Sequence, residues 1–147
     1  MKVSDGCDIQ NPRLVDEDTW LWCYGPGWSE ERVAARRGWD RSGKWLIFLD
    51  ENSVVEAWNT IVHATKNGEL GFRAKVSTAK PTRFSFSDYV IGVYNEDADD
   101  AEDVKRIREK LRELGFGVAD KLFYKREATT QAGIYHGDDE RASSLVL

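Results

Sequence analysis

Five basic side chains at or beside predicted strands are the strongest chemical signal in the chain. They are Lys44, Lys75, Lys80, Lys125 and Arg126. Each lies next to residues with the pattern of buried strand positions, and buried Lys or Arg is rare without an anionic partner. If several of them converge on one sheet face, they form a site for a phosphate or a carboxylate. The alternative is that each cation snorkels at a strand end, with its stem on apolar surface and its head in water.

Aromatic residues are a second signal, because six Trp, five Tyr and six Phe occur among 147 residues. Alternation in the segment 19–24 puts Trp20, Trp22 and Tyr24 on one face of a strand. These rings could stack on a base or another ring of a ligand, and Tyr135 is a further candidate for ligand contact. The alternative is that the aromatic residues fill an interface between the sheet and the helices.

The remaining polar motifs are weaker. His136 could reach a site from its loop, although exposure to solvent is the commoner fate of a loop histidine, and His63 is expected to be solvated. Two isolated histidines and two isolated cysteines have no zinc-site spacing, so no metal and no cofactor are expected. The acidic run 96–103 lacks the pattern of a calcium loop and suits a helix N-terminus. The chain has no P-loop, dinucleotide fingerprint or nucleophile elbow.

Length and charge limit the classes of protein that remain. With 147 residues and 41% hydrophobic residues, residues 1–147 are expected to form a single domain, with a lead-in (1–16) and a polar tail (137–147) as candidate mobile ends. The net charge of −5 argues against generic nucleic-acid coating. No apolar run approaches the ~20 residues that span a bilayer. Without a hydrophobic signal segment or a Cys-x-x-Cys motif, a cytoplasmic location is expected.

Hydrophobic periodicity predicts the elements that must position these side chains. Strands are expected at 19–24, 44–49, 73–78, 89–94 and 121–125, and helices at 53–67 and 101–114. Residues 28–43 have the pattern of a short capped helix or a loop, and Ser53 with Glu56 has the spacing of a capping box. The order of elements predicts an α+β domain with a mainly antiparallel sheet. Both helices should cover one sheet face and leave the other open for a site; their shared contacts are expected at Trp58, Ile61, Ile107 and Leu111.

Several segments of the chain, taken in their order, resemble a known family. They are 19–24, 43–49, 68–71, 74–78 and 124–135. Their order over residues 17–137 is similar to the phosphothreonine lyase domain family that includes relatives of the human basophilic leukaemia expressed protein. This resemblance implies a fold like translation initiation factor 4E, with a curved, mainly antiparallel sheet and two helices on its convex face.

The pattern is more distantly similar to phosphothreonine lyases of bacterial pathogens and to the lyase domains of some lanthipeptide synthetases. This resemblance implies that Lys75 is a general base, that Lys44 lies on the phosphate side and that Arg126 binds the phosphate. The histidine of the family's Lys-x-His strand falls on Leu46. Leucine cannot donate a proton, and losing a general acid typically lowers a rate by ~10²–10⁴-fold.

We therefore expect a binding module for a phosphorylated ligand, whether a nucleotide, a phosphorylated metabolite or a phosphopeptide. The first alternative is a phosphothreonine or phosphoserine lyase that performs β-elimination, with Lys75 as the base and His136 or water as the acid. The second is a protein-interaction domain in which the aromatic residues and the segment 32–41 contact a protein partner. A cationic pocket attracts phosphate with or without the acid, because binding and proton transfer are separate tasks.

Overall fold

The computed structural model describes residues 9–35, 41–80, 89–127 and 143–146. In these ranges six strands form one sheet: β1 (Trp20–Tyr24), β2 (Gly43–Leu49), β3 (Arg73–Ser77), β4 (Tyr89–Asn95), β5 (Phe123–Arg126) and β6 (Ser143–Val146). The helical elements are the 3₁₀-helix η1 (Pro12–Leu14) and the α-helices α1 (Glu30–Ala34), α2 (Val54–Lys66) and α3 (Ala101–Glu113).

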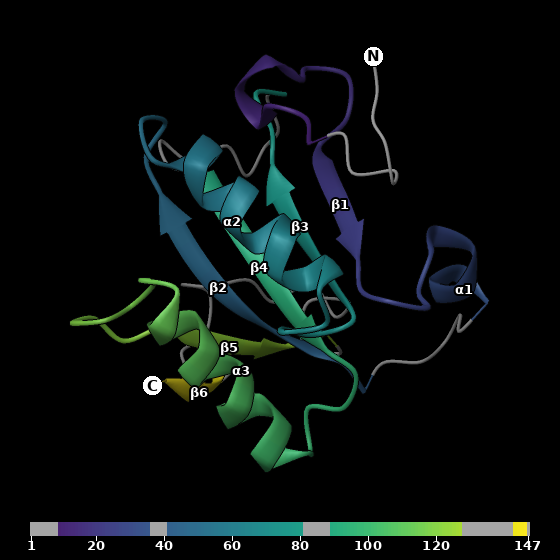
Figure 1. Cartoon of the computed structure of the whole chain (residues 1–147), viewed down its shortest axis with the longest axis vertical. Coiled ribbons are helices and arrows are strands. Elements are labelled where there is room, and N and C mark those ends of the chain that lie inside the picture. Colours follow the sequence, from purple (N-terminus) through teal and green to yellow (C-terminus); the bar gives the residue numbers. More distant parts are fainter. Residues whose placement is uncertain (1–8, 36–40, 81–88, 128–142, 147) are drawn as a thin grey trace.

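The strand order is β1-β3-β4-β2-β5-β6, and each neighbouring pair is antiparallel. Figure 1 shows α2 and α3 on the same side of this sheet, with α3 nearer to β5. The prediction of a curved antiparallel sheet with two helices on one face is confirmed. Neither of these helices covers the opposite side, which we call the open face.

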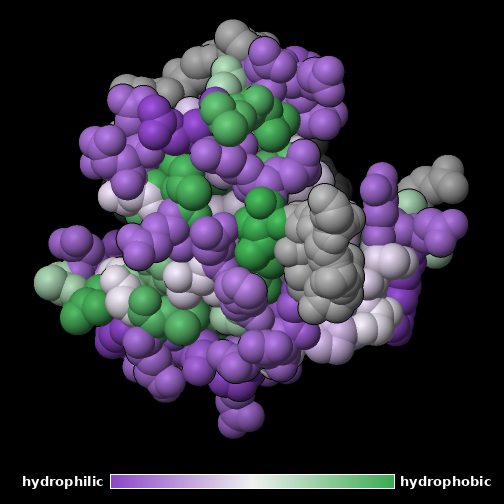
Figure 2. Space-filling view, turned by 45° about the horizontal axis from the view of Figure 1, so that its top comes forward, coloured by the Kyte–Doolittle hydropathy of each residue, from purple (hydrophilic) through white to green (hydrophobic). Residues whose placement is uncertain are grey.

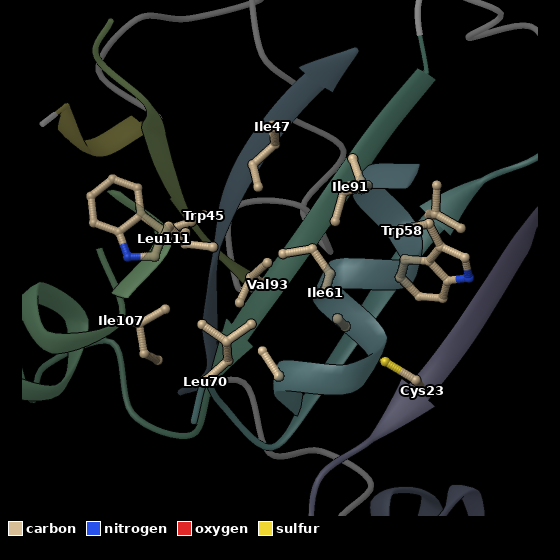
Figure 3. Packing of buried hydrophobic residues seen from close by; sticks show 14 of the residues in the cluster. Cys23, Trp45, Ile47, Trp58, Ile61, Leu70, Ile91, Val93, Ile107 and Leu111 are labelled. Atoms are coloured by element: carbon tan, nitrogen blue, oxygen red, sulfur yellow. The ribbon is translucent and has the colours of Figure 1, made fainter. Parts of the chain in front are cut away.

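The core lies between the helices and the sheet (Figure 3). Ile61, Ile107 and Leu111 are fully buried there, and Trp58 is 2% exposed, so the predicted contacts between the helices and one common sheet face are confirmed. Trp45 from β2 belongs to the same cluster. Some of the aromatic residues therefore fill the interface between the sheet and the helices, which was one of the two interpretations of the high aromatic content.

Helix α2 begins where predicted, with Ser53 as its N-cap, but it lacks the predicted capping contact. The Ser53 side chain makes no capping hydrogen bond, so the predicted capping box is wrong. The Asp50 Oδ1 instead accepts hydrogen bonds from the backbone N–H groups of Asn52 and Ser53 at 3.0 and 2.9 Å. An aspartate that accepts from the backbone two residues later is a common turn before a helix, and here it satisfies the Ser53 N–H, from which Glu56 would accept in a capping box.

The predicted polar tail contains a strand, because β6 pairs antiparallel with β5. This strand was not predicted, because it is only four residues long and two of its residues, Ser143 and Ser144, are polar. Pairing with β5 supplies the backbone hydrogen bonds that a short strand lacks alone. The predicted capped helix within 28–43 is α1, where Ser29 Oγ accepts from the backbone N–H of Arg32 at 3.1 Å.

Hydrophilic residues cover most of the surface seen in Figure 2, and the hydrophobic residues there lie in small separate groups. Scattered apolar groups of this kind are normal for protein surfaces and need no partner to explain them. Within the described ranges, no helix has the length and apolar character needed to cross a membrane.

Candidate functional site

The cross-strand register builds a row of polar side chains on the open face. Directly opposed residues of antiparallel strands project to the same face. The row runs across five strands in the order Tyr24, Arg73, Tyr94, Lys44 and Lys125. A neighbouring row on the same face consists of Trp22, Lys75, Gly92, Leu46 and Phe123. Residues that are up to 103 positions apart in the chain thus meet on one surface because the sheet is antiparallel throughout.

Two cations in these rows lie over aromatic rings. The Lys75 Nζ is 3.8 Å from the centroid of Trp20 and 5.5 Å from that of Trp22. The Arg73 Cζ is 4.5 Å from the centroid of Trp22 and 4.4 Å from that of Tyr94. Such cation–π contacts contribute about 0.5–2 kcal/mol each. We call these five residues the cation–aromatic cluster.

The polar atoms of this cluster are short of partners. Within the described part of the chain, Arg73 and Lys75 make no side-chain hydrogen bond and no ion pair, and Arg73 Nε is buried without an acceptor. The Tyr94 hydroxyl is also buried without a hydrogen-bond partner. Buried polar groups without partners cost roughly 1–3 kcal/mol each, so such a group in a folded protein requires an explanation. A bound anion would satisfy all three side chains.

Lys44 and Lys125 extend the positive charge toward β5. Both side chains are almost fully buried, each 3% exposed. The Lys44 Nζ lies 3.0 Å from Glu127 Oε1 and 5.3 Å from the ring centroid of Tyr94. Burial lowers the pKa of Lys44, and the charge of Glu127 opposes this effect. Lys44 is therefore paired, but its charge still acts on the neighbouring cluster.

The pKa of Lys75 lies far below its ordinary value. Burial, followed by the positive charges of Lys44, Arg73 and Lys125, lowers the pKa of Lys75 to about 7, while Glu127 raises it. At neutral pH the amine is therefore present in both protonation states. A lysine of this kind can accept a proton as a base, or gain one when an anion approaches.

Two glycines lie at close approaches in this part of the sheet. A Cβ on Gly92 would lie 3.4 Å from Lys44 Cδ and 3.5 Å from Lys75 Cγ, so the absent side chain leaves room for both lysine stems. A Cβ on Gly71 would lie 1.5 Å from the backbone oxygen of Tyr94, which no side chain can accommodate. Gly71 thus lets the chain before β3 approach the end of β4, where Arg73 meets Tyr94.

The structure separates two of the predicted ligand residues from the cluster. Lys80 is exposed beyond the far end of β3, where its Nζ donates to the Glu17 carbonyl at 3.2 Å. Arg126 follows Lys125 in β5 and projects to the other face, with an ion pair to Asp99 at 2.8 Å. Tyr135 and His136 lie outside the described residues. Tyr24 stands in the polar row itself, opposite Arg73.

Arg73 and Tyr94 are central to the site, and the sequence analysis did not name either as a site residue. The signal was present in the strand alternation. Arg73 precedes Lys75 by two residues in β3, and Tyr94 follows Gly92 by two in β4, so each shares the face of its neighbour. The position of Leu46 on the open face also follows from register, because Leu46 pairs with Gly92 in the row that contains Lys75.

A cleft of about 560 Å³ opens beside the C-terminal end of β1. It is lined by Tyr24, Gly25, Pro26, Trp28, Ser29, Glu30, His63, Lys66 and Asn67. Burial, then the charge of Glu30, raises the pKa of Tyr24. The exposed His63 is solvated there, as expected. Since Tyr24 also faces Arg73, the cleft adjoins the polar row, but Arg73, Lys75 and Lys44 do not line it.

Metal-binding chemistry has no support in this region. In the parts of the chain that the structure describes, no group of three or more His, Cys, Asp or Glu residues could hold a metal ion. Cys23, the described cysteine, is buried on the helix side of β1. The candidate site therefore consists of cations, aromatic rings and one carboxylate.

A comparison with protein families finds one match. The model of the family described as "Basophilic leukemia-expressed protein Bles03" matches residues 32–133, which is more than half of the chain. The match includes β2 to β5, and therefore Arg73, Lys75, Tyr94 and Lys44. Trp20 and Trp22 lie before its first residue.

Solved structures of translation initiation factor 4E are similar in fold. Caenorhabditis elegans eIF4E-3, in complex with the 4E-binding protein Mextli and a cap analog, has a TM-score of 0.56 and 16% identity over 87% of this chain and 68% of that chain. Schistosome eIF4E, complexed with m7GpppA and 4E-BP, has a TM-score of 0.56 and 14% identity over 73% of this chain and 59% of that one. These identities show the fold alone, and it is the fold that the sequence predicted.

Proposed function

The chain belongs to the family of the basophilic leukemia-expressed protein Bles03, and we propose that it is a binding module for a phosphorylated ligand on the open face of its sheet. The observation that carries this proposal is the cation–aromatic cluster, where Arg73 and Lys75 are packed together and make no ion pair with any of the described residues. Two adjacent cations repel each other, and a phosphate between them would turn this repulsion into charge-assisted hydrogen bonds.

The aromatic rings suggest how the rest of the ligand is held. Trp22 is 37% exposed, and one side of its ring carries Arg73. An aromatic group of the ligand could stack on the remaining surface, and such stacking contributes ~1–3 kcal/mol per base in nucleic-acid-binding proteins. A nucleotide is therefore a reasonable ligand class. The complexes with cap analogs and m7GpppA of the structural neighbours make a capped nucleotide one of the probes to use.

The proposal is tested with four probes of increasing complexity: inorganic phosphate, GMP, the cap analog m7GTP and a phosphothreonine peptide with its unphosphorylated copy. A ligand at 100 times its Kd stabilises the folded state by ~2.7 kcal/mol, which a thermal unfolding assay detects. We expect stabilisation by at least one phosphorylated probe and loss of it in R73Q. Lys80→Gln is the matched control, because Lys80 is exposed and apart from the cluster.

The absence of stabilisation by every probe would contradict the binding module. It would favour the alternative of a protein-interaction domain, in which the aromatic residues of β1 contact a partner. The 4E-binding proteins in the complexes of the structural neighbours make such a partner reasonable. Quenching of indole fluorescence by GMP, but not by the phosphothreonine peptide, would favour a nucleotide ligand, because stacking requires a ring.

One observation favours a second candidate, a lyase that eliminates phosphate from phosphothreonine or phosphoserine. The pKa of Lys75 near 7 leaves a neutral amine that could remove an α-proton; the electron pair then forms a Cα–Cβ double bond as the Cβ–O bond breaks and phosphate leaves. Leu46 in the same row provides no proton for the departing phosphate. We therefore expect no dehydrated product from phosphothreonine peptides by mass spectrometry.

The variant Leu46→His supplies an acid without changing the cations, and a gain of elimination in it would identify position 46 as the missing site of proton transfer. Robust elimination by the unaltered protein that disappears in K75A would establish the lyase and overturn our preference. The matched control for lost lysine charge is Lys121→Ala, since Lys121 is exposed before β5.

A further inference from the structure

We propose that the open-face site selects the dianionic form of a phosphomonoester, and that Lys75 takes up one proton when this ligand binds. This inference rests on the proposed function, and it goes further by assigning the charge state of the ligand and a specificity-determining role to one residue. The cluster brings together a guanidinium and an amine, and neither makes an ion pair with the described residues.

Arg73 supplies the positive charge of a planar guanidinium. Lys75 supplies a charge that depends on its surroundings. Both groups approach the same indole, with Arg73 Cζ and Lys75 Nζ at 4.5 and 5.5 Å from the centroid of Trp22. The Tyr94 hydroxyl, buried without a partner in the same cluster, offers a further hydrogen-bond donor.

The charged groups that face Lys75 come from several elements. Three of them are positive: Arg73 lies on the same strand, Lys44 lies on β2 and Lys125 lies on β5. From β1 come Trp20 and Trp22, which carry no charge. From β4 comes Tyr94, which is neutral because burial raises its pKa. Glu127, at the end of β5, is the acidic group among those acting on Lys75, and it is paired with Lys44.

These surroundings oppose a proton on Lys75 when the site holds no ligand. A monoanion, such as a phosphodiester, presents one negative charge, and the guanidinium of Arg73 in the cluster can match it without any change of protonation. A dianion leaves one negative charge over, and this charge favours protonation of the nearest amine. The second charge of a phosphomonoester is thus matched by a second cation that the protein acquires during binding. A phosphodiester gains less from this step.

The effect on affinity follows from the protonation of Lys75, whose pKa is about 7 without ligand. At pH 8 about nine in ten Lys75 amines are neutral, so binding takes up about 0.9 proton, and affinity falls nearly tenfold per unit as the pH rises further. Below about pH 6 the phosphomonoester loses its second charge, which also weakens binding. We therefore expect the affinity to be highest between about pH 6 and 7.

The experiment compares phenyl phosphate with its monomethyl ester, which has the same ring and one charge less. Calorimetry at pH 8 in Tris and in HEPES gives the number of protons taken up, because the two buffers differ in ionisation enthalpy. We expect tighter binding of phenyl phosphate by tenfold or more, with uptake near one proton, and uptake near zero for the ester. K75Q should bring the two affinities within about threefold, while the exposed-lysine variant K121Q should match the wild type.

Equal affinities with no proton uptake would overturn this inference and leave the proposed function standing, whereas no binding of either compound would overturn both. Should K75Q fail to fold, the unaltered protein gives a second measurement. After reductive ¹³C-methylation, the Lys75 signal should titrate near neutral pH without ligand and at least one pH unit higher when saturated with phenyl phosphate. A Lys75 signal that does not move on saturation would also overturn the inference.

Discussion

On the helix-covered face of the sheet, the buried polar side chains of Trp45 and Tyr124 are hydrogen-bonded, whereas on the open face Arg73 and Tyr94 hold buried polar atoms without partners. The Trp45 Nε1 donates to the Val104 carbonyl at 3.0 Å, and the Tyr124 hydroxyl donates to Asn95 Oδ1. The two faces share the same strands, so strand geometry cannot account for this difference. It lies in what each face packs against.

The difference indicates where stability and binding reside. Apolar burial against α2 and α3 stabilises the fold, with each fully buried large side chain contributing about 1.5–3 kcal/mol. The cation–aromatic cluster works against folding, because it gathers Arg73 and Lys75 beside Lys44 with little compensation. Groups that destabilise the fold yet occupy a common surface are characteristic of functional sites.

The largest expected effect is on the helix-covered face. Ile61→Ala should lower the free energy of unfolding by about 2–5 kcal/mol, because Ile61 is fully buried and its removal leaves a cavity. Urea denaturation measures this loss, and Val55→Ala, at a half-buried position of the same helix, should cost less. Binding of phenyl phosphate by the folded fraction should be unchanged. A loss of binding would show that the two faces are coupled.

The next effect concerns the open face without ligand. The pKa of Lys75 in the folded protein, about 7, lies below its ordinary value of 10.5, so the unfolded chain holds a proton that the folded chain has lost. Stability attributable to Lys75 must therefore rise with pH above 7. Between pH 7 and 9 we expect the wild type to gain roughly 1–2 kcal/mol relative to Lys75→Met, which has no amine to titrate.

This measurement is made by urea denaturation at both pH values, so that other titrating groups cancel between the two proteins. At pH 7 or below, Lys75→Met should be at least as stable as the wild type, because the charge that it removes is unfavourable. If the difference in free energy of unfolding between the two proteins does not change with pH, the surroundings of Lys75 do not oppose its protonation. The open face then does not destabilise the fold through Lys75.

Much of the fold could be predicted from the sequence because period and composition specify it locally. The helical spacing of Trp58 and Ile61, and of Ile107 and Leu111, identified two helices and the faces on which they meet the sheet. The capping box at the start of α2 was wrong, because Asp50 can also accept from the Ser53 backbone N–H and only the local geometry decides between the two acceptors. A four-residue strand such as β6 exists through its pairing with β5.

The site was predictable only in part. Lys44, Lys75, Trp20 and Trp22 were named in advance, because charged and aromatic residues on strands are conspicuous. Register depends on long-range pairing, and it is register that brings Arg73 beside Tyr94 and sends Arg126 to the other face. The lowered pKa of Lys75 likewise requires burial, together with cations from three strands that only the folded sheet assembles.

A smaller effect is expected from filling the gap between the two lysine stems. Gly92→Leu should displace the side chains of Lys44 and Lys75, since even a Cβ would contact both. We expect phenyl phosphate to bind about tenfold more weakly, which corresponds to about 1.4 kcal/mol and to the partial loss of charge-assisted hydrogen bonds. Gly92→Ala is the control, because its Cβ would make ordinary contacts at 3.4–3.6 Å. Equal binding by both variants would exclude the space around Gly92 from the site.

The smallest expected effect comes from Arg126, which the sequence placed among the ligand residues and the strand alternation assigns to the helix-covered face. Its guanidinium lies 2.8 Å from Asp99, and both side chains are largely exposed. Arg126→Gln should therefore lower the free energy of unfolding by less than about 1 kcal/mol, as expected for a surface ion pair. The affinity for phenyl phosphate at pH 7 should change by less than about twofold, because this charge is exposed to solvent and is screened by salt. The same titration on R73Q provides the comparison, and there we expect a loss of tenfold or more. If R126Q loses as much affinity as R73Q, the anion site extends around the end of β5 to the helix-covered face, and ligand binding is not confined to the open face.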